Sequence, residues 1–372
     1  MKKRVLIMMA VMCLLPFGAV AGCVKPANAE KVKIRFDYQD AMIETDSALN
    51  DIQTEEAVKG AAVVLPSPEI APYRFGGWFY APGGAGGRVE DGTPAEEGLT
   101  FYAYWLGTEG LEYANGAVKK GSVPADARSV VIAPAHDGVL TSEIGLNGFR
   151  DMAALASAHI PYTVQKIANN GFYRCGLTDV ALPMYLQHIG AEAFYGCNHL
   201  KSVRLPASAA WIGYQAFFAC ESLQYVMFRG STLPEATTLS FSHTAALLVP
   251  ETALDAFKGK FYGMAGQILS HEALSGDFIT AGAKLVKYTG ASETVALPDG
   301  VTGIAAYAFY GNTAVKRVEI PAAVATVEDY AFANMADGLT LSVAFAEGGA
   351  PAGWGAKWNC DSGAKEYEVR FA

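Results

Sequence analysis

Two hydrophobic patterns recur in phase along residues 108–372. In the first, an apolar residue is followed five positions later by phenylalanine, and neighbouring copies lie 22 or 23 residues apart within each of two runs, which are separated by 92 residues from Ile212 to Ile304. In the second, apolar residues fill the first, fourth and sixth positions of segments such as LTDVALP, LKSVRLP and VKRVEIP. A period of this size indicates one structural unit that stacks on copies of itself. The apolar–phenylalanine pairs are Ile144/Phe149, Ile167/Phe172, Ile189/Phe194, Ile212/Phe217, Ile304/Phe309 and Val327/Phe332.

Each copy of the second pattern predicts a short strand. Val203 and Leu205 alternate with Arg204, so the first two are expected to point into a core and the arginine outward. Coils that pair backbone to backbone lie about 4.8 Å apart, which would place Phe194 over Phe217 in a continuous core. The predicted fold is therefore mainly β, a solenoid with about 22–23 residues per coil.

The repeat fades between Gly230 and Thr280. The stretch TAALLVPETALDAFKGKFYG predicts a strand and then a short amphipathic helix that buries Phe257. Open solenoid ends need covering, so segment 245–270 is interpreted as a cap or a break, with degenerate repeats as the alternative. GDFITAGAKLVKYTG would restart the stack.

The segments IGAEAFYGCNHLKSVRLP and IAAYAFYGNTAVKRVEIP resemble the BspA-like leucine-rich repeats of surface proteins from host-associated bacteria. Some copies depart from the pattern, because Gly148 and Gly171 precede the phenylalanine and no glycine follows Ile304. The resemblance implies a leucine-rich-repeat solenoid that recognises other proteins and adheres to host or neighbouring cells.

Residues 31–105 have a different rhythm, with VKIRFDY, AAVVLPSP, YRFGGWFY and LTFYAYW as expected strands of a compact β domain. Their order resembles the internalin B-repeat family, which implies a small β-grasp-like unit. We expect the tryptophans of this domain to pack in its core or edge, with an exposed contact patch as the alternative. The positions that match the family's motif and final strand are Phe75, Gly77, Trp78, Tyr104 and Trp105.

The N-terminus has the layout of a secretory signal, because Lys2–Arg4 precede an apolar run from Val5 to Val20. The run ends in VAGC, which resembles a lipobox and predicts lipidation at Cys23. Cleavage after Ala29 would instead release a secreted protein, and an uncleaved anchor is a further alternative.

These patterns predict an exported, envelope or surface-located protein built from several segments. The expected order is a signal peptide over 1–22, a linker over 23–30, a B-repeat-like domain over 31–105, repeats over 106–275, and a second run of repeats with a C-terminal cap over 276–372.

Composition narrows the possible partners. The 372-residue chain has a formal net charge of -9, which opposes binding to a nucleic-acid backbone. We therefore predict no nucleic-acid partner, whereas the oligomeric state cannot be inferred.

The thiols outside the signal and lipobox follow the repeat. Cys175, Cys197 and Cys220 lie 22 and 23 residues apart, so they are expected to stack as buried apolar fillers. A disulfide or a metal site involving these thiols or Cys360 is the open alternative.

We find no catalytic constellation in the sequence. GGAGG at 83–87 lacks the lysine or acidic partner of a phosphate cradle, and the six histidines share no motif, so each is expected to be a solvated surface residue. Neighbouring carboxylates such as Glu96 and Glu97 do not face each other across a cleft. We predict a non-enzymatic protein without cofactor or metal, with an unrecognised hydrolase as the remote alternative.

Stacked strands would align their outward residues into a continuous ribbon, the kind of surface with which repeat proteins bind. We predict that this ribbon binds a host or bacterial surface protein; an envelope scaffold without a host ligand is the alternative. The residues proposed for this face are Lys201, Arg204, Gln224, Tyr225, Met227, Lys316, Arg317 and Glu319.

Overall fold

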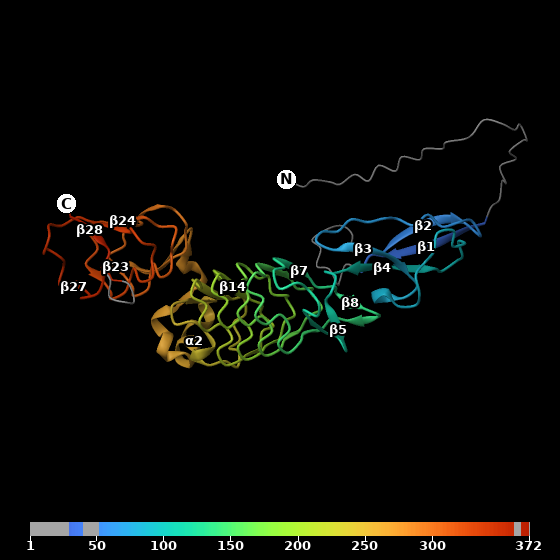
Figure 1. The fold of residues 1–372 in the computed structure, drawn as a ribbon, viewed down its shortest axis with the longest axis horizontal. Helices are drawn as coiled ribbons and strands as arrows, with labels where there is room; N and C mark the ends of the chain where they lie inside the picture. Colours follow the sequence, from blue (N-terminus) through green and yellow to red (C-terminus); the bar gives the residue numbers. More distant parts are fainter. Residues whose placement is uncertain (1–29, 40–51, 361–365, 372) are drawn as a thin grey trace, which may run out of the picture.

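The computed structural model describes residues 30–39, 52–360 and 366–371. Within these ranges the chain is mainly β, and three regions follow one another along its longest axis: an N-terminal sheet, a first repeat array and a second repeat array (Figure 1). The predicted signal peptide and Cys23 lie outside the described residues. In the described part of the chain, no helix combines the length and apolar character needed to cross a membrane.

The N-terminal region is a four-stranded mixed sheet with the order β2-β1-β4-β3, in which β1 runs parallel to β4. Trp78 and Trp105 are 2% and 1% exposed, so both are core residues as expected. Each indole nitrogen donates a hydrogen bond to a backbone carbonyl, at Pro66 and Tyr38 respectively. The strands are β1 (Lys31–Asp37), β2 (Gln53–Val58), β3 (Arg74–Phe79) and β4 (Thr100–Leu106).

One strand prediction in this region was wrong. AAVVLPSP forms no strand, only a bridge at Ala62, and Val64 is 76% exposed. The second strand is QTEEAV, Gln53–Val58, which pairs along one edge of β1. Half-buried and exposed positions alternate along this edge strand, but its only apolar residues are the last two, so the hydrophobic signal that the prediction relied on is weak there.

The first array carries two sheets on different sides of the coil, and their strands pair in parallel except for the antiparallel pair β5 and β6. The short-strand sheet has the order β15-β13-β12-β10-β6-β5 and the long-strand sheet the order β14-β16-β17-β18. The former contains β5 (Glu112–Ala114), β6 (Ala117–Lys119), β10 (Glu143–Ile144), β12 (Lys166–Ile167), β13 (His188–Ile189) and β15 (Trp211–Ile212). The latter contains β14 (Ser202–Leu205), β16 (Tyr225–Phe228), β17 (Ala246–Val249) and β18 (Ile268–Ser270). Two further pairs are β7 (Ser129–Val131) with β11 (Ser157–His159), and β8 (Ala135–His136) with β9 (Val139–Leu140).

A phenylalanine stack runs through the core of this array. The rings of Phe172, Phe194 and Phe217 stack with centroids 5.3 and 5.1 Å apart, close to the spacing of neighbouring strands. All three side chains are fully buried. The expected placement of Phe194 over Phe217 is therefore confirmed.

The coil turns at the phenylalanine through left-handed backbone positions. Asn147, Asn170, Glu192 and Gln215, at the same place in four coils, have φ between 54° and 57°. Next to these left-handed residues, backbone groups of neighbouring coils bond to each other. The amide N–H of Phe172, for example, donates a hydrogen bond to the carbonyl of Ala193 in the next coil at 2.7 Å. Non-glycine residues rarely adopt positive φ, so these inter-coil bonds must hold the turn in place.

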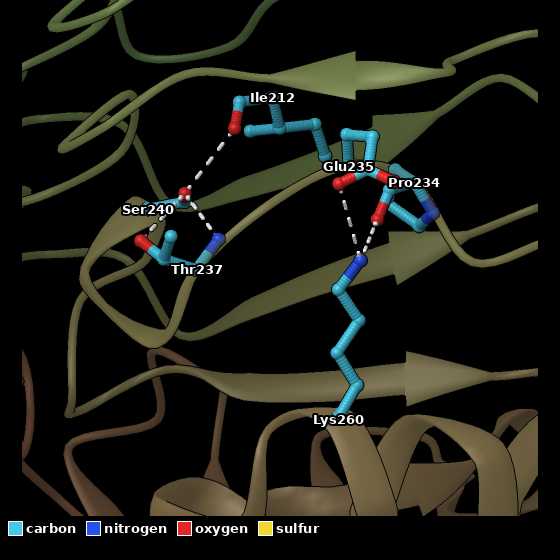
Figure 2. Close-up of polar contacts among 6 residues, drawn as sticks. All are labelled: Ile212, Pro234, Glu235, Thr237, Ser240 and Lys260. Atoms are coloured by element: carbon cyan, nitrogen blue, oxygen red, sulfur yellow. Dashed lines mark hydrogen bonds and ion pairs between the residues drawn. The ribbon is translucent and has the colours of Figure 1, made fainter.

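The region where the repeat fades begins with one further coil. Phe241 stacks on Phe217 at 6.3 Å, and β17 pairs in parallel with β16. The hydroxyl of Ser240 donates to the carbonyl of Ile212 in the preceding coil at 3.3 Å (Figure 2). A hydroxyl thus joins two coils at this turn.

A short helix then closes the first array. Helix α2 (Leu254–Lys260) buries Phe257 against the core, and Lys260 Nζ donates to the carbonyl of Pro234 at 2.7 Å (Figure 2). Strand β18 follows and pairs in parallel with β17. The 3₁₀ helices of the chain are η1 (Pro82–Gly84), η2 (Thr238–Ser240), η3 (Glu251–Ala253), η4 (Tyr262–Gln267) and η5 (His271–Ala273).

The second array has its own core, in which Phe309 stacks on Phe332 at 5.0 Å. It opens with antiparallel strands β19 to β21 and continues with parallel coils. Its first sheet contains β19 (Leu274–Ser275), β20 (Phe278–Ala281), β21 (Lys284–Tyr288), β23 (Gly303–Ile304), β25 (Thr326–Val327) and β27 (Gly353–Trp354). Its second contains β22 (Thr294–Ala296), β24 (Arg317–Ile320), β26 (Thr340–Val343) and β28 (Glu368–Arg370).

Candidate interaction surfaces

The long-strand sheet carries Arg204, Tyr225 and Met227 of the residues predicted to bind a partner, and Lys201 and Gln224 directly precede its strands. The register pairs Arg204 with Met227, so these side chains lie side by side on the outward face. Lys201 and Arg204 are exposed, whereas Gln224, Tyr225 and Met227 are half-buried.

The far end of that face is covered by the second array. Outward residues of the long-strand sheet, Leu248 and Leu269, form a buried cluster with Ile279 of β20 and Val286 of β21. Tyr225 and Met227 pack against this cluster, which we call the junction cluster. Its buried members are Ala246, Leu248, Leu269, Ile279 and Val286.

The expected continuous ribbon is therefore interrupted. The long-strand sheet of the first array ends at β18, and Lys316, Arg317 and Glu319 lie on or beside a separate sheet. There Lys316 forms an ion pair with Glu293 of the preceding coil. Antiparallel strands between the arrays separate the two groups, so the structure does not bring the predicted residues together on one surface.

The short-strand sheet presents a different outward face. Its register aligns Glu143, Lys166, His188 and Trp211 in a single column across four coils. Lys166 forms an ion pair with Glu143 at 3.2 Å, and the rings of His188 and Trp211 stack at 5.7 Å with an interplanar angle of 2°. The outward column therefore changes from charged to aromatic along the array.

Aromatic and apolar side chains also gather on the turns that lead into these strands. Tyr162 and Tyr185 meet edge to face at 4.6 Å, and Met184 lies beside Tyr185 in the chain. Met184, Tyr185 and Trp211 are 49%, 46% and 47% exposed. We call Tyr162, Met184, Tyr185, His188 and Trp211 the aromatic strip.

The sequence reasoning missed the aromatic strip because it considered only the longer strands as a binding face. A usable signal existed: the residue directly before each apolar member of an apolar–phenylalanine pair must point outward if that member points inward. At His188 and Trp211 this position is aromatic.

The environment of His188 favours its neutral form. Partial burial lowers the pKa of His188 below its usual value, and the charge of Lys166 lowers it further, while Glu143 acts in the opposite direction. A neutral imidazole can stack on Trp211 and offer one donor and one acceptor to a partner.

A shallow groove of about 450 Å³ lies on another side of the first array. Arg174, Tyr195, His199 and Glu221 are among its lining residues. Next to it the ring of Tyr195 stacks on that of Tyr173 at 5.2 Å. The lining contains both basic and acidic side chains, so it favours neither a cationic nor an anionic ligand.

The three repeat thiols are structural, as expected. Cys175, Cys197 and Cys220 are free and buried, and each Sγ–H donates to the carbonyl of a phenylalanine in an earlier coil at 3.0–3.2 Å. Burial raises the pKa of Cys220 to about 12 and that of Cys197 further still. These thiols are therefore protonated and unreactive at neutral pH. Cys360 is also buried.

The prediction that all histidines are solvated was wrong for His159. Its Nε2 lies 3.0 Å from the hydroxyl of Tyr73, and burial lowers the pKa of His159. This contact joins the N-terminal region to β11. His271 also has a hydrogen-bond partner, because its Nε2 lies 2.8 Å from the carbonyl of Phe228.

In the ranges that the structure describes, no three His, Cys, Asp or Glu side chains gather to hold a metal ion.

The repeats match a known family model. The family model described as BspA type leucine rich repeat region matches residues 142–249 and 279–343, in six copies. The repeats in these two segments are BspA-type leucine-rich repeats. The expected resemblance is thus confirmed for the repeat segments. No curated protein matches the chain.

Several solved structures match part of the chain. A leucine rich cell surface protein from Faecalibacterium prausnitzii is 19% identical, with 59% of this chain and 60% of that chain covered and a TM-score of 0.22. The Treponema pallidum leucine rich repeat protein is 19% identical, over 41% and 93%, with a TM-score of 0.29. The pneumococcal vaccine antigen PcpA is 15% identical, over 71% and 87%, with a TM-score of 0.28. The chain thus spans 60% of the length of the first of these structures.

Proposed function

We propose that this protein is an exported, non-enzymatic recognition protein that binds a protein ligand through the aromatic strip of its first BspA-type array. The single observation that carries the proposal is the exposure of Trp211, Tyr185 and Met184 on neighbouring coils. Aromatic residues and methionine are enriched where proteins contact each other, and tryptophan and tyrosine dominate binding energies there.

The solenoid provides a rigid support for such a surface. Trp211 is held from one side by the stacked ring of His188, and the backbone of both residues is paired across β13 and β15. A side chain that is already ordered loses little conformational entropy on binding. A large apolar side chain that stays half-exposed in this rigid setting is better explained by a partner than by packing.

A binding screen tests this proposal. The chain from Glu30 onward is offered a panel of host extracellular proteins and bacterial surface proteins. A variant with Tyr185→Ala and Trp211→Ala should lose binding by about tenfold or more to every ligand that the parent chain captures. A matched variant with Lys201→Ala and Arg204→Ala, on the long-strand sheet, should keep it. The reverse pattern would instead support the face predicted from the sequence, to which Lys201 and Arg204 belong. Absence of any ligand would favour an envelope scaffold.

The location is proposed as the cell surface, with Cys23 as the lipid-bearing residue and the N-terminal sheet as a B-repeat-like spacer. The intact mass of the native protein should match a chain that starts at Cys23 and carries acyl groups. A mass that matches a start at Glu30, with partitioning into the aqueous phase, would make the protein a secreted binder. Resistance to protease on intact cells would contradict exposure at the surface.

A further inference from the structure

A buried lysine lies where the two arrays meet. Lys287 on β21 is 2% exposed, and its Nζ donates to the carbonyl of Thr244 at 3.1 Å and to that of Tyr307 at 3.0 Å. Thr244 belongs to the first array and Tyr307 to the second. One amine therefore bridges the backbones of both arrays.

The surroundings of Lys287 suit a neutral amine. A neutral amine has two N–H groups, which match the two carbonyl acceptors, whereas the ammonium form has a third donor to satisfy. The ring of Tyr310 lies 5.8 Å from Nζ and gives only weak compensation for a charge. Within the described ranges no carboxylate forms an ion pair with Lys287, and burial lowers its pKa to about 7.

Other titratable groups lie on the elements around this lysine. On β21 itself, Lys284 is paired with Glu328. The remaining groups, listed by element, are Tyr288 on β21, Asp277 before β20, Tyr307 and Tyr310 after β23, His243 beside Thr244, and Glu221, whose charge acts on Tyr310. His243 is the histidine among these groups, and a test must separate its contribution from that of Lys287.

The apolar contact between the two arrays is separate from the core of either array. Each array has its own hydrophobic core, and the junction cluster is a separate and much smaller set of apolar side chains. A cleft of about 240 Å³ lies beside it, lined by Thr244 and Val286 among others. Small interfaces of this kind separate more readily than the cores they connect.

We propose that Lys287 is a pH-sensitive latch between the two arrays: the neutral amine holds them together, and its protonation lets them separate. In the open state the amine is solvated and regains an ordinary affinity for protons. Opening therefore takes up a proton, and the open fraction rises as the pH falls from about 10.5 towards 7 and levels off below.

Thiol labelling of an Ala246→Cys variant of the chain from Glu30 onward measures this opening, because Ala246 is 1% exposed in the junction cluster. The labelling rate is divided at each pH by the rate of the same thiol in denaturant, which removes the pH dependence of thiol chemistry. We expect this ratio to rise about tenfold between pH 8 and pH 6. Labelling of the native Cys220 reports unfolding of the array and should stay slower.

Two further variants identify the side chain that causes the pH dependence of labelling. In the Ala246→Cys background, Lys287→Met should abolish the tenfold change, because methionine replaces the amine with a neutral side chain of similar length. His243→Gln should keep the change. Persistence of the response in Lys287→Met, or a ratio equal at pH 6 and pH 8 in the parent, would overturn the latch. A wild-type chain labelled with ¹³Cε-lysine gives a check without substitution, since titration of Lys287 near its ordinary value of about 10.4 would also overturn it.

Discussion

The two outward faces of the first array arise from the same coils but have different surroundings. On the long-strand sheet, Leu248 and Leu269 are covered by β20 and β21 of the second array. On the short-strand sheet and the turn before it, Trp211 and Tyr185 stay about half-exposed. An outward apolar residue in a repeat is therefore not by itself evidence of a binding face, because the next part of the chain can cover it.

The largest difference between the faces should appear when each receives a charge. Leu248→Asp places a carboxylate among the buried apolar side chains of the junction cluster and should lower the free energy of unfolding by about 3–5 kcal/mol, since the charge loses its hydration there. The matched change Trp211→Asp should cost about 1 kcal/mol or less, because the new charge stays in water. Chemical denaturation of both variants measures this, and equal costs would contradict the assignment of a covered and an open face.

Trp211→Ala separates binding from stability on the open face. The stacking on His188 is lost, so we expect the free energy of unfolding to fall by about 1 kcal/mol or less. The affinity for the captured ligand should fall at least tenfold, which corresponds to about 1.4 kcal/mol. Titration calorimetry and thermal unfolding on the same samples give the two values. A large fall in stability with unchanged affinity would make Trp211 a structural residue.

Lys166→Ala removes the ion pair with Glu143 at the charged end of the same column. Both side chains are partly exposed, so solvent screening limits the stabilisation, and we expect a change of about 0.5 kcal/mol or less. Repeating the measurement in 1 M salt should abolish even this difference. A change that survives high salt would indicate packing rather than charge.

The smallest expected effect is the pH response of His188. The pKa of His188 is lower in the folded chain than in the unfolded chain. As the pH falls below about 6.5, the unfolded state therefore binds more protons than the folded state. Stability should therefore decrease as the pH falls from about 6.5 through the lower folded pKa, and the loss should be weaker in His188→Gln. Denaturation curves at pH 7 and pH 5 test this, and an identical pH dependence in the variant would assign it to another group.

Most of the solenoid follows from local sequence. The spacing of Ile189, Phe194 and Cys197 specifies which side chains enter the coil, and the structure stacks the phenylalanines and thiols accordingly. The same reasoning failed for Gln53–Val58, because an edge strand with charged residues carries a weak hydrophobic signal.

The sequence by itself determined the repeat, its period and the inward positions, because every coil must bury the same apolar set against its neighbours. The tertiary structure alone decided which outward positions are free. Tyr225 and Met227 looked accessible in the pattern, but strands that follow about fifty residues later in the chain pack over their sheet. It also decided that Lys287 is buried between two backbones, since alternation within one strand contains no information about what a separate array will bring against it.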